Sequence, residues 1–363
     1  MRTRSFVLVF ACLLVLAACA GREPAPHAGS PAALPGWAAD DQAAALEAFL
    51  VSCPTILQRN PQSPLGDVAA AGSTADWQRV CRIAQTTPPS AARAFFERHF
   101  TAVPQHAGDG GYDGLFTGYY EPLLSGSRWP TARHQTPLHT VPRDLPRRRG
   151  HPLLARAAID RGALAREGLE LMWVDDPIGK FFLQIQGSGQ VELADGERIR
   201  VGYAGQNGHA YYAIGRHLID AGYIPVQLMS MQAIDGWLRT APPDQAWNLM
   251  HRNPSYVFFR ELGPVATTPG PIGAMGLPVS PGRSLAVDRS FTPLGSLVWV
   301  ETTEPTPQGG ERPLRRLMVA QDVGGAIRGP VRGDVFWGAG RQAEYAAGHM
   351  KQPGRLWQLV PRP

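Results

Sequence analysis

LAVDRSFTPLGS at residues 285–296, VAQDVGGAIRG at residues 319–329 and VRGDVFWG at residues 331–338 each carry one aspartate after a short β-prone run. These aspartates are Asp288, Asp322 and Asp334. A carboxylate at a strand end beside a glycine turn can point into a cleft, because glycine lets the backbone come close to a ligand. Aspartate in a glycine-rich turn also commonly bonds its own backbone. Three such aspartates together, with Gly-Gly-Ala-Ile between the last two, favour a functional site.

The rest of the chain predicts a mainly β protein with helices near its N-terminus. The 363 residues are too many for one ordinary domain, so we expect two. The 40 glycines and 34 prolines separate short β-prone runs, a pattern that favours barrels over a doubly wound sheet. We expect helices at residues 40–51, 91–100, 210–221 and 231–238. We expect strands at residues 181–186, 190–193, 199–203, 256–259, 297–301, 314–321, 334–337 and 355–360.

The N-terminus has the pattern of a bacterial lipoprotein signal. Arg2 and Arg4 precede an apolar run at residues 6–18, which is short for a membrane span. Leu-Ala-Ala-Cys at residues 16–19 then predicts cleavage after residue 18 and lipidation of Cys19; an ordinary signal peptide is the alternative. We therefore expect a signal peptide at 1–18 and a lipidated flexible tether at 19–36, rich in Ala, Pro and Gly. Ala20 after the cysteine indicates the outer membrane, facing the periplasm.

Two further features follow from an exported location. Cys53 and Cys81 can pair in an oxidising compartment, or they can remain two separate buried thiols. The net charge of +5 suits an anionic wall polymer or anionic lipid. Nucleic acid is not expected as a partner, because none resides in the periplasm.

Common cofactor and metal motifs are absent from the sequence. There is no HExxH, no Cys/His array with ligand spacing and no phosphate-binding loop. QGSGQ at residues 186–190 differs from the GxSxG of serine hydrolases. Three aspartates can hold a hard cation, but glycosidic chemistry uses them better, so we expect neither a metal nor a cofactor.

Several further motifs identify a resemblance. They are FTGYYEP at 116–122, FFLQIQGSGQVEL at 181–193, VGYAGQNGHAYYAIGRHLI at 201–219, MSMQAIDGWL at 229–238 and NPSYVFF at 253–259. With the three aspartates, they resemble the membrane-bound lytic murein transglycosylase A (MltA) family and its C-terminal three-aspartate (3D) domain. The motifs follow the family's order from about residue 90 to the end of the chain.

The resemblance implies a domain plan. A double-psi β-barrel domain with N-terminal helices is expected at residues 37–122 and 263–363. A second, inserted β-barrel domain is expected at residues 123–262, with a groove between the two. FTGYYEP, where the chain passes from the first domain into the inserted domain, would then lie on the groove wall.

The resemblance also implies the reaction. A lytic transglycosylase cleaves the β-1,4 bond between N-acetylmuramic acid and N-acetylglucosamine and leaves a 1,6-anhydro end, so one carboxyl can act as general acid and then as base. By the family pattern this residue is Asp334, whose pKa must be raised by burial or by Asp322. Arg332 would oppose that rise from a shared strand face, and we expect it in a turn instead.

The remaining site residues are expected either to support Asp334 or to bind the substrate. Asp322 is expected to orient groups or to perturb the pKa of Asp334, whereas Asp288 has the setting of a structural residue. Glu121 departs from the family pattern, either as a second acid or, as we prefer, as a surface charge. Substrate contacts are expected from two segments, through aromatic stacking and amide-type hydrogen bonds, with core packing and a hairpin turn as the alternatives: Thr117, Gly118, Tyr119, Tyr120, Gln186, Gly187, Ser188 and Gly189.

Two functions are therefore compared. The first is a peptidoglycan lytic transglycosylase anchored by lipid to the outer membrane, a monomer able to join wall-enzyme complexes. The second is a non-enzymatic, peptidoglycan-binding lipoprotein with an expansin-like barrel. An acid in the groove separates them, and Asp334 provides one.

Overall fold

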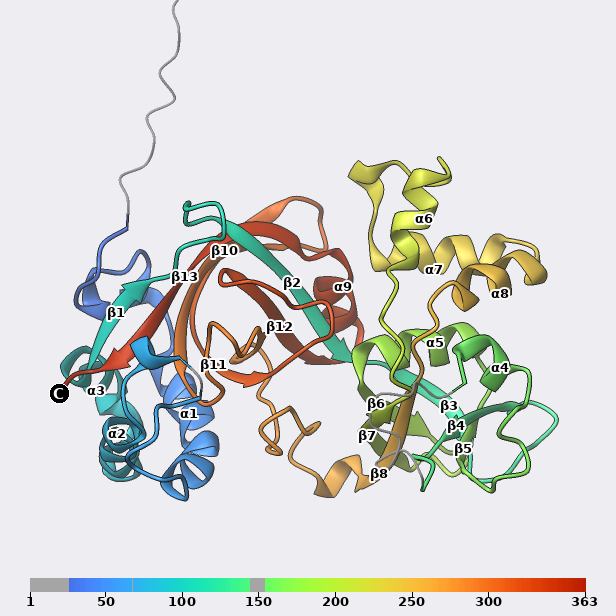
Figure 1. Ribbon diagram of the computed structural model, residues 1–363, viewed down its shortest axis with the longest axis horizontal. Coiled ribbons are helices and arrows are strands. Elements are labelled where there is room, and N and C mark those ends of the chain that lie inside the picture. Colours follow the sequence, from blue (N-terminus) through green and yellow to red (C-terminus); the bar gives the residue numbers. More distant parts are fainter. Residues whose placement is uncertain (1–25, 67, 144–153) are drawn as a thin grey trace, which may run out of the picture.

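The chain folds mainly into β-structure, with helices at its edges. The computed structural model describes residues 26–66, 68–143 and 154–363, so Cys19 and the signal sequence lie outside the described residues. Two sheets organise the molecule, and Figure 1 shows them side by side, joined by β2 and by the segment that follows β8. No helix in these ranges is both long enough and apolar enough to cross a membrane.

The larger sheet closes into a barrel. Its strands run in the order β1-β13-β10-β11-β9-β12-β2, and β2 also pairs with β13, which closes a ring of six strands. The pairs β11–β9 and β12–β2 are parallel, and the other pairs are antiparallel. The bounds are β1 (Phe100–Pro104), β2 (Gly114–Glu121), β9 (Ser284–Val287), β10 (Leu297–Pro305), β11 (Glu311–Asp322), β12 (Arg332–Ala339) and β13 (Lys351–Pro361).

Three helices cover the outside of this barrel. They are α1 (Gln42–Leu57), α2 (Thr74–Thr86) and α3 (Ala92–His99). The Asp41 side chain caps α1, and a reciprocal Ser73–Asp76 capping box begins α2. Their apolar faces bury Trp37, Phe49 and other side chains against β10, β11 and β13. Cys53 on α1 and Cys81 on α2 form a disulfide, the pairing that the sequence left open.

The second sheet is built from the inserted segment. Its strand order is β4-β5-β3-β6-β7-β8. The strands are β3 (Leu123–Ser127), β4 (Thr136–His139), β5 (Glu170–Val174), β6 (Ser188–Glu192), β7 (Arg198–Gln206) and β8 (Val257–Pro264). Leu138, Met172, Leu183 and Val201 are fully buried in its core.

The remaining helices surround the junction of the two sheets. The helices α4 (Arg156–Asp160), α5 (Pro177–Gln186), α6 (Ile214–Asp220), α7 (Met231–Thr240) and α8 (Pro243–His251) belong to the inserted segment, and α9 (Arg341–His349) lies beside β2 and β12. Figure 1 shows α6, α7 and α8 standing above the second sheet. The Gln232 side chain of α7 donates to the Glu344 carbonyl of α9 (3.1 Å), which ties the helical part to the barrel.

One expected strand is a helix. Residues 181–186 were predicted as a strand but form the second half of α5. The Asp176 side chain caps its start, Pro177 occupies its first turn, and Gly187 ends it with φ +82°. These are ordinary helix start and stop signals, and they outweigh the β propensity of the apolar run. The other expected strands and helices each overlap an observed element of the same type.

Glu121 is not the surface charge that we preferred. Its side chain is 3% exposed, at the point where β2 leaves the barrel. Its Oε1 accepts from Arg200 Nε (2.8 Å), and Gln190 Nε2 donates to Oε2 (3.3 Å). This buried ion pair joins β2 to β6 and β7, because a buried carboxylate needs a cationic partner.

Candidate active site

A groove of about 710 Å³ lies between the barrel and the inserted sheet. Its barrel wall comes from β2, β12 and the loop after β11, and its other wall comes from α5, β7 and β8. Residues of the connecting segment 272–276 close one side. Six of the expected substrate-binding residues line the groove together with Asp322 and Asp334: Thr117, Gly118, Tyr119, Gln186, Gly187 and Ser188. Tyr120, Gly189 and Asp288 do not line it.

Strand pairing brings Asp334 to this groove. In the parallel pair of β12 and β2, Asp334 lies opposite Thr117, and Ala286 of β9 lies on its other side. The Thr117 hydroxyl donates a hydrogen bond to Asp334 Oδ1. Burial raises the pKa of Asp334 above its ordinary value, against the opposing effects of this hydrogen bond and of the Arg332 charge. A carboxyl with a raised pKa can carry a proton into the groove.

Arg332 lies in the ladder, not in a turn as expected. It is the first residue of β12 and pairs with Leu115. Its Nη2 donates to the Thr117 hydroxyl oxygen (2.9 Å), and its Nη1 donates to the Gly333 carbonyl (2.6 Å). The Arg332 charge therefore does oppose protonation of Asp334, as considered from the sequence. The Thr117 hydroxyl lies between the guanidinium and the carboxyl and is hydrogen-bonded to both.

Asp322 lies at the end of β11 with both oxygens occupied. Oδ1 accepts from the backbone N–H groups of Ala274 and Val323 (2.9 Å each), and Oδ2 accepts from the Tyr119 hydroxyl (3.0 Å). Burial raises the pKa of Asp322, these hydrogen bonds oppose the rise, and the Asp334 charge adds to it. Asp322 thus holds the connecting segment, the β11 end and β2 together on the groove wall.

Asp288 has a structural setting. Its Oδ2 accepts from Gly329 N–H (2.9 Å) and its Oδ1 from Ser290 N–H (3.1 Å). Burial works to raise the pKa of this carboxyl, but these hydrogen bonds outweigh it and the pKa is lowered. The residue fixes the 323–331 loop, which joins the strands that carry Asp322 and Asp334.

The two tyrosines of FTGYYEP are buried, which is the core-packing alternative to stacking on a sugar. Tyr119 packs on Phe336 with ring centroids 5.1 Å apart. Tyr120 is 6% exposed and does not line the groove, and its backbone N–H donates to Gln186 Oε1 (3.0 Å). At Gly118 a Cβ would lie 2.5 Å from Trp337 Nε1, so glycine is needed for β2 to pack against β12.

The second predicted segment reaches the groove through the end of α5. Gln186, Gly187 and Ser188 lie where α5 turns into β6, so the expected hairpin turn is a helix C-terminus. Gly189 lies within β6, opposite Val201.

The structure adds groove residues that sequence reasoning missed. Arg156 lines the groove, with its guanidinium bonded to the carbonyls of Asn253 and Ser255 and placed 4.7 Å from the Phe181 ring centroid. Tyr211 and Arg260 also line the groove, and both are exposed. Tyr203 and Gln206 of β7 line it as well. A lone arginine in a sequence carries no signal of which wall it will occupy.

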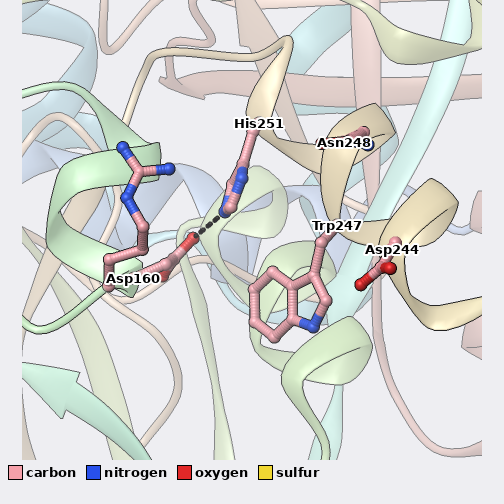
Figure 2. A pocket seen from close by; sticks show the side chains of 6 residues that line it. Asp160, Asp244, Trp247, Asn248 and His251 are labelled. Carbon is pink, nitrogen blue, oxygen red and sulfur yellow. Dashed lines mark ion pairs between the residues drawn. The ribbon is translucent and has the colours of Figure 1, made fainter.

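A second cavity, of about 450 Å³, lies on the inserted domain and shares no lining residue with the groove. Figure 2 shows the His251 imidazole pointing to the Asp160 carboxylate, with the Trp247 ring beside them. Asp160 Oδ1 also accepts from Lys180 Nζ at 3.0 Å. Burial lowers the pKa of His251, so its 3.4 Å contact with Asp160 is not a full ion pair near neutral pH. The described ranges contain no group of three or more His, Cys, Asp or Glu side chains placed to hold a metal ion.

A closed barrel, a second sheet and an acid-bearing groove between them fit an enzyme that acts on an extended substrate. Comparison with known proteins gives the family. Residues 115–260 match the MltA specific insert domain, and residues 283–360 match the 3D domain. This chain belongs to the family of the membrane-bound lytic murein transglycosylase A.

Individual relatives agree with this assignment. The membrane-bound lytic murein transglycosylase A of Escherichia coli K12 is 37% identical over 254 residues, which are 68% of this chain and 66% of that relative. The solved lytic transglycosylase LtgG of Burkholderia pseudomallei is 42% identical, with 93% of this chain and 95% of that chain covered and a TM-score of 0.61. E. coli MltA with bound chitohexaose is 31% identical, with 89% and 90% covered and a TM-score of 0.70.

Proposed function

We propose that this protein is a peptidoglycan lytic transglycosylase that cleaves the β-1,4 bond between N-acetylmuramic acid and N-acetylglucosamine and leaves 1,6-anhydro ends. Family membership and the relative with bound chitohexaose support the substrate class. The observation that carries the proposal is the Asp334 carboxyl, which lines the groove with a pKa raised by burial.

The reaction needs one carboxyl in two successive roles. Protonated Asp334 donates its proton to the glycosidic oxygen as the bond from that oxygen to C1 breaks. The 6-hydroxyl of the same muramic acid then attacks C1, and its proton passes to the Asp334 carboxylate. The acid is restored, and no water is consumed.

The surroundings of Asp322 favour this route over hydrolysis. A hydrolase that inverts its substrate needs a second carboxylate to activate water, and one that retains configuration needs it as a nucleophile. Both oxygens of Asp322 already accept hydrogen bonds from Tyr119, Ala274 and Val323. A carboxylate so occupied is a poor base, and attack by the substrate's own hydroxyl makes a second base unnecessary.

We also propose the type of barrel, the domain bounds and the cellular location of the protein. The six-stranded closed ring supports a double-psi barrel formed by residues 37–122 and 263–363, and the second sheet supports an inserted domain at 123–262. Gln186, Gly187 and Ser188 are proposed to contact the N-acetyl groups of the glycan. We propose a lipid anchor on Cys19 at the outer membrane, facing the periplasm, and a monomer able to join wall-enzyme complexes.

The proposed function is tested by digesting purified sacculi and separating the products by mass. The wild-type protein should release muropeptides with 1,6-anhydro ends, and Asp334→Asn should reduce release by about 10²- to 10⁴-fold, the range of general acid catalysis. Reducing ends would indicate a hydrolase. Binding to sacculi without soluble products would leave the non-enzymatic wall-binding protein.

A further inference from the structure

The two oxygens of the Asp334 carboxyl have different surroundings. Oδ1 accepts the Thr117 hydroxyl. This is the one hydrogen bond that the Asp334 side chain makes within the described part of the chain, so Oδ2 is left to the groove. A proton that is useful to a substrate has to be on Oδ2.

The direction of the Thr117 bond is set by Arg332. A guanidinium has only donors, and Arg332 Nη2 donates to Thr117 Oγ1 at 2.9 Å. The hydroxyl therefore accepts from Arg332 and has its own hydrogen to donate. Among the described residues, Asp334 Oδ1 is the one acceptor that it reaches.

Arg332 is itself held in place. Its Nη1 donates to two main-chain carbonyls, those of Gly333 (2.6 Å) and Leu115 (3.3 Å). These carbonyls belong to the two paired strands β12 and β2. The guanidinium is thus fixed by the same ladder that sets Thr117 opposite Asp334.

We propose that Arg332 is a positioning residue that acts through the Thr117 hydroxyl to keep the acidic proton of Asp334 on Oδ2. This inference rests on the proposed function. A proton on Oδ1 would face the hydrogen of Thr117, and turning that hydroxyl away would leave a partly buried donor without a partner. After the proton has been given up, the same hydroxyl stabilises the carboxylate on Oδ1.

The arrangement also sets how strongly the acid holds its proton. An ion pair made directly with Arg332 would keep Asp334 ionised, whereas Thr117 keeps the cation one hydrogen bond away. The other titratable groups near Asp334 are Tyr119 on β2 and Asp322 at the end of β11, and its β9 neighbour is the uncharged Ala286. Burial raises the pKa of Asp334, and Thr117 and Arg332 moderate that rise.

The test is the pH profile of anhydro-end release for Thr117→Val, Thr117→Ser and Arg332→Ala. A donor removed from the carboxylate raises the pKa of Asp334, so its protonated form persists to higher pH. Thr117→Val and Arg332→Ala should both move the alkaline limb to higher pH. Thr117→Val should also lower kcat by about 10- to 100-fold, part of what a general acid supplies. Thr117→Ser keeps the hydroxyl, so it should keep the alkaline limb and the kcat of the wild type.

The control is Arg216→Gln, which removes an equal charge from an exposed Arg216–Asp220 pair on α6 and should leave the profile unchanged. The proposal would be overturned if Thr117→Val and Thr117→Ser lowered kcat equally and neither moved the alkaline limb of the pH profile. Carboxyl ¹³C NMR titration of Asp334 gives a second measurement that does not need activity: its pKa must rise in Thr117→Val. Full activity of Asp334→Asn would instead refute the proposed function, while this titration would still test the hydrogen bonds.

Discussion

At the scale of single residues, partners in space decide what each carboxylate can do. Asp322 and Asp334 follow similar β-prone runs, yet one is saturated by three donors and the other has one oxygen free. Glu121 looked like a surface charge next to Pro122, but the partner that buries it, Arg200, lies on β7. Local sequence cannot show such partners, because they are brought together by strands far apart in the chain.

Removal of Glu121 should therefore be costly. Glu121→Ala leaves Arg200 buried without its counter-ion, and we expect a loss of about 3–5 kcal/mol in the free energy of unfolding. The matched control is Glu192→Ala, which breaks the exposed pair with Arg198 and should cost about 0–1 kcal/mol. Urea denaturation of both variants measures the difference; equal losses would show that the Glu121 pair contributes no more than a surface contact.

At the scale of elements, the end of α5 determines the insert wall of the groove. The helix stops because Gly187 takes φ +82°, a conformation that costs other residues about 1 kcal/mol or more. Gln186 and Ser188 line the groove on either side of that turn. The sequence contained the signals, Asp176-Pro177 before the run and Gly187 after it, but the apolar run FFLQIQ has no clear period.

Two glycine substitutions should have opposite effects. Gly187→Ala should lower the free energy of unfolding by about 1–2 kcal/mol and weaken glycan cleavage, because the left-handed turn is lost or strained. Gly236→Ala lies on the exposed face of α7 with no atom near its new Cβ, and should raise stability by about 0.5–1 kcal/mol. Thermal melts and anhydro-end release check both. Stabilisation by Gly187→Ala would argue against the observed helix end.

At the scale of the whole molecule, stability and chemistry are separated in space. The Cys53–Cys81 bridge joins two helices on the outside of the barrel, and neither helix lines the groove. Asp334 lies on β12, whose neighbours in the closed ring are β2 and β9, and it lines the groove. The helices therefore support the barrel from outside without contacting the groove.

Loss of the disulfide should lower stability and leave catalysis intact. The double variant Cys53→Ser/Cys81→Ser opens a loop with a sequence separation of 28 residues, and the chain-entropy model predicts a loss of about 3–4 kcal/mol. The melting temperature should fall, whereas kcat/KM well below that temperature should stay the same. A parallel fall in kcat/KM would show that the helices are coupled to the groove.

The sequence by itself determined the mainly β class, the family and the set of acidic residues, because strand-length β runs, glycine turns and ordered motifs are local patterns. It also predicted the helix at residues 91–100 from its 3–4 spacing of apolar residues, and the observed helix spans Ala92–His99. Only the tertiary structure decided that Arg332 faces Thr117, that Tyr120 leaves the groove and that Glu121 is buried. Each of these depends on the register of β2 against β12 or on the packing of the inserted sheet, and such long-range pairing leaves no trace in neighbouring residues.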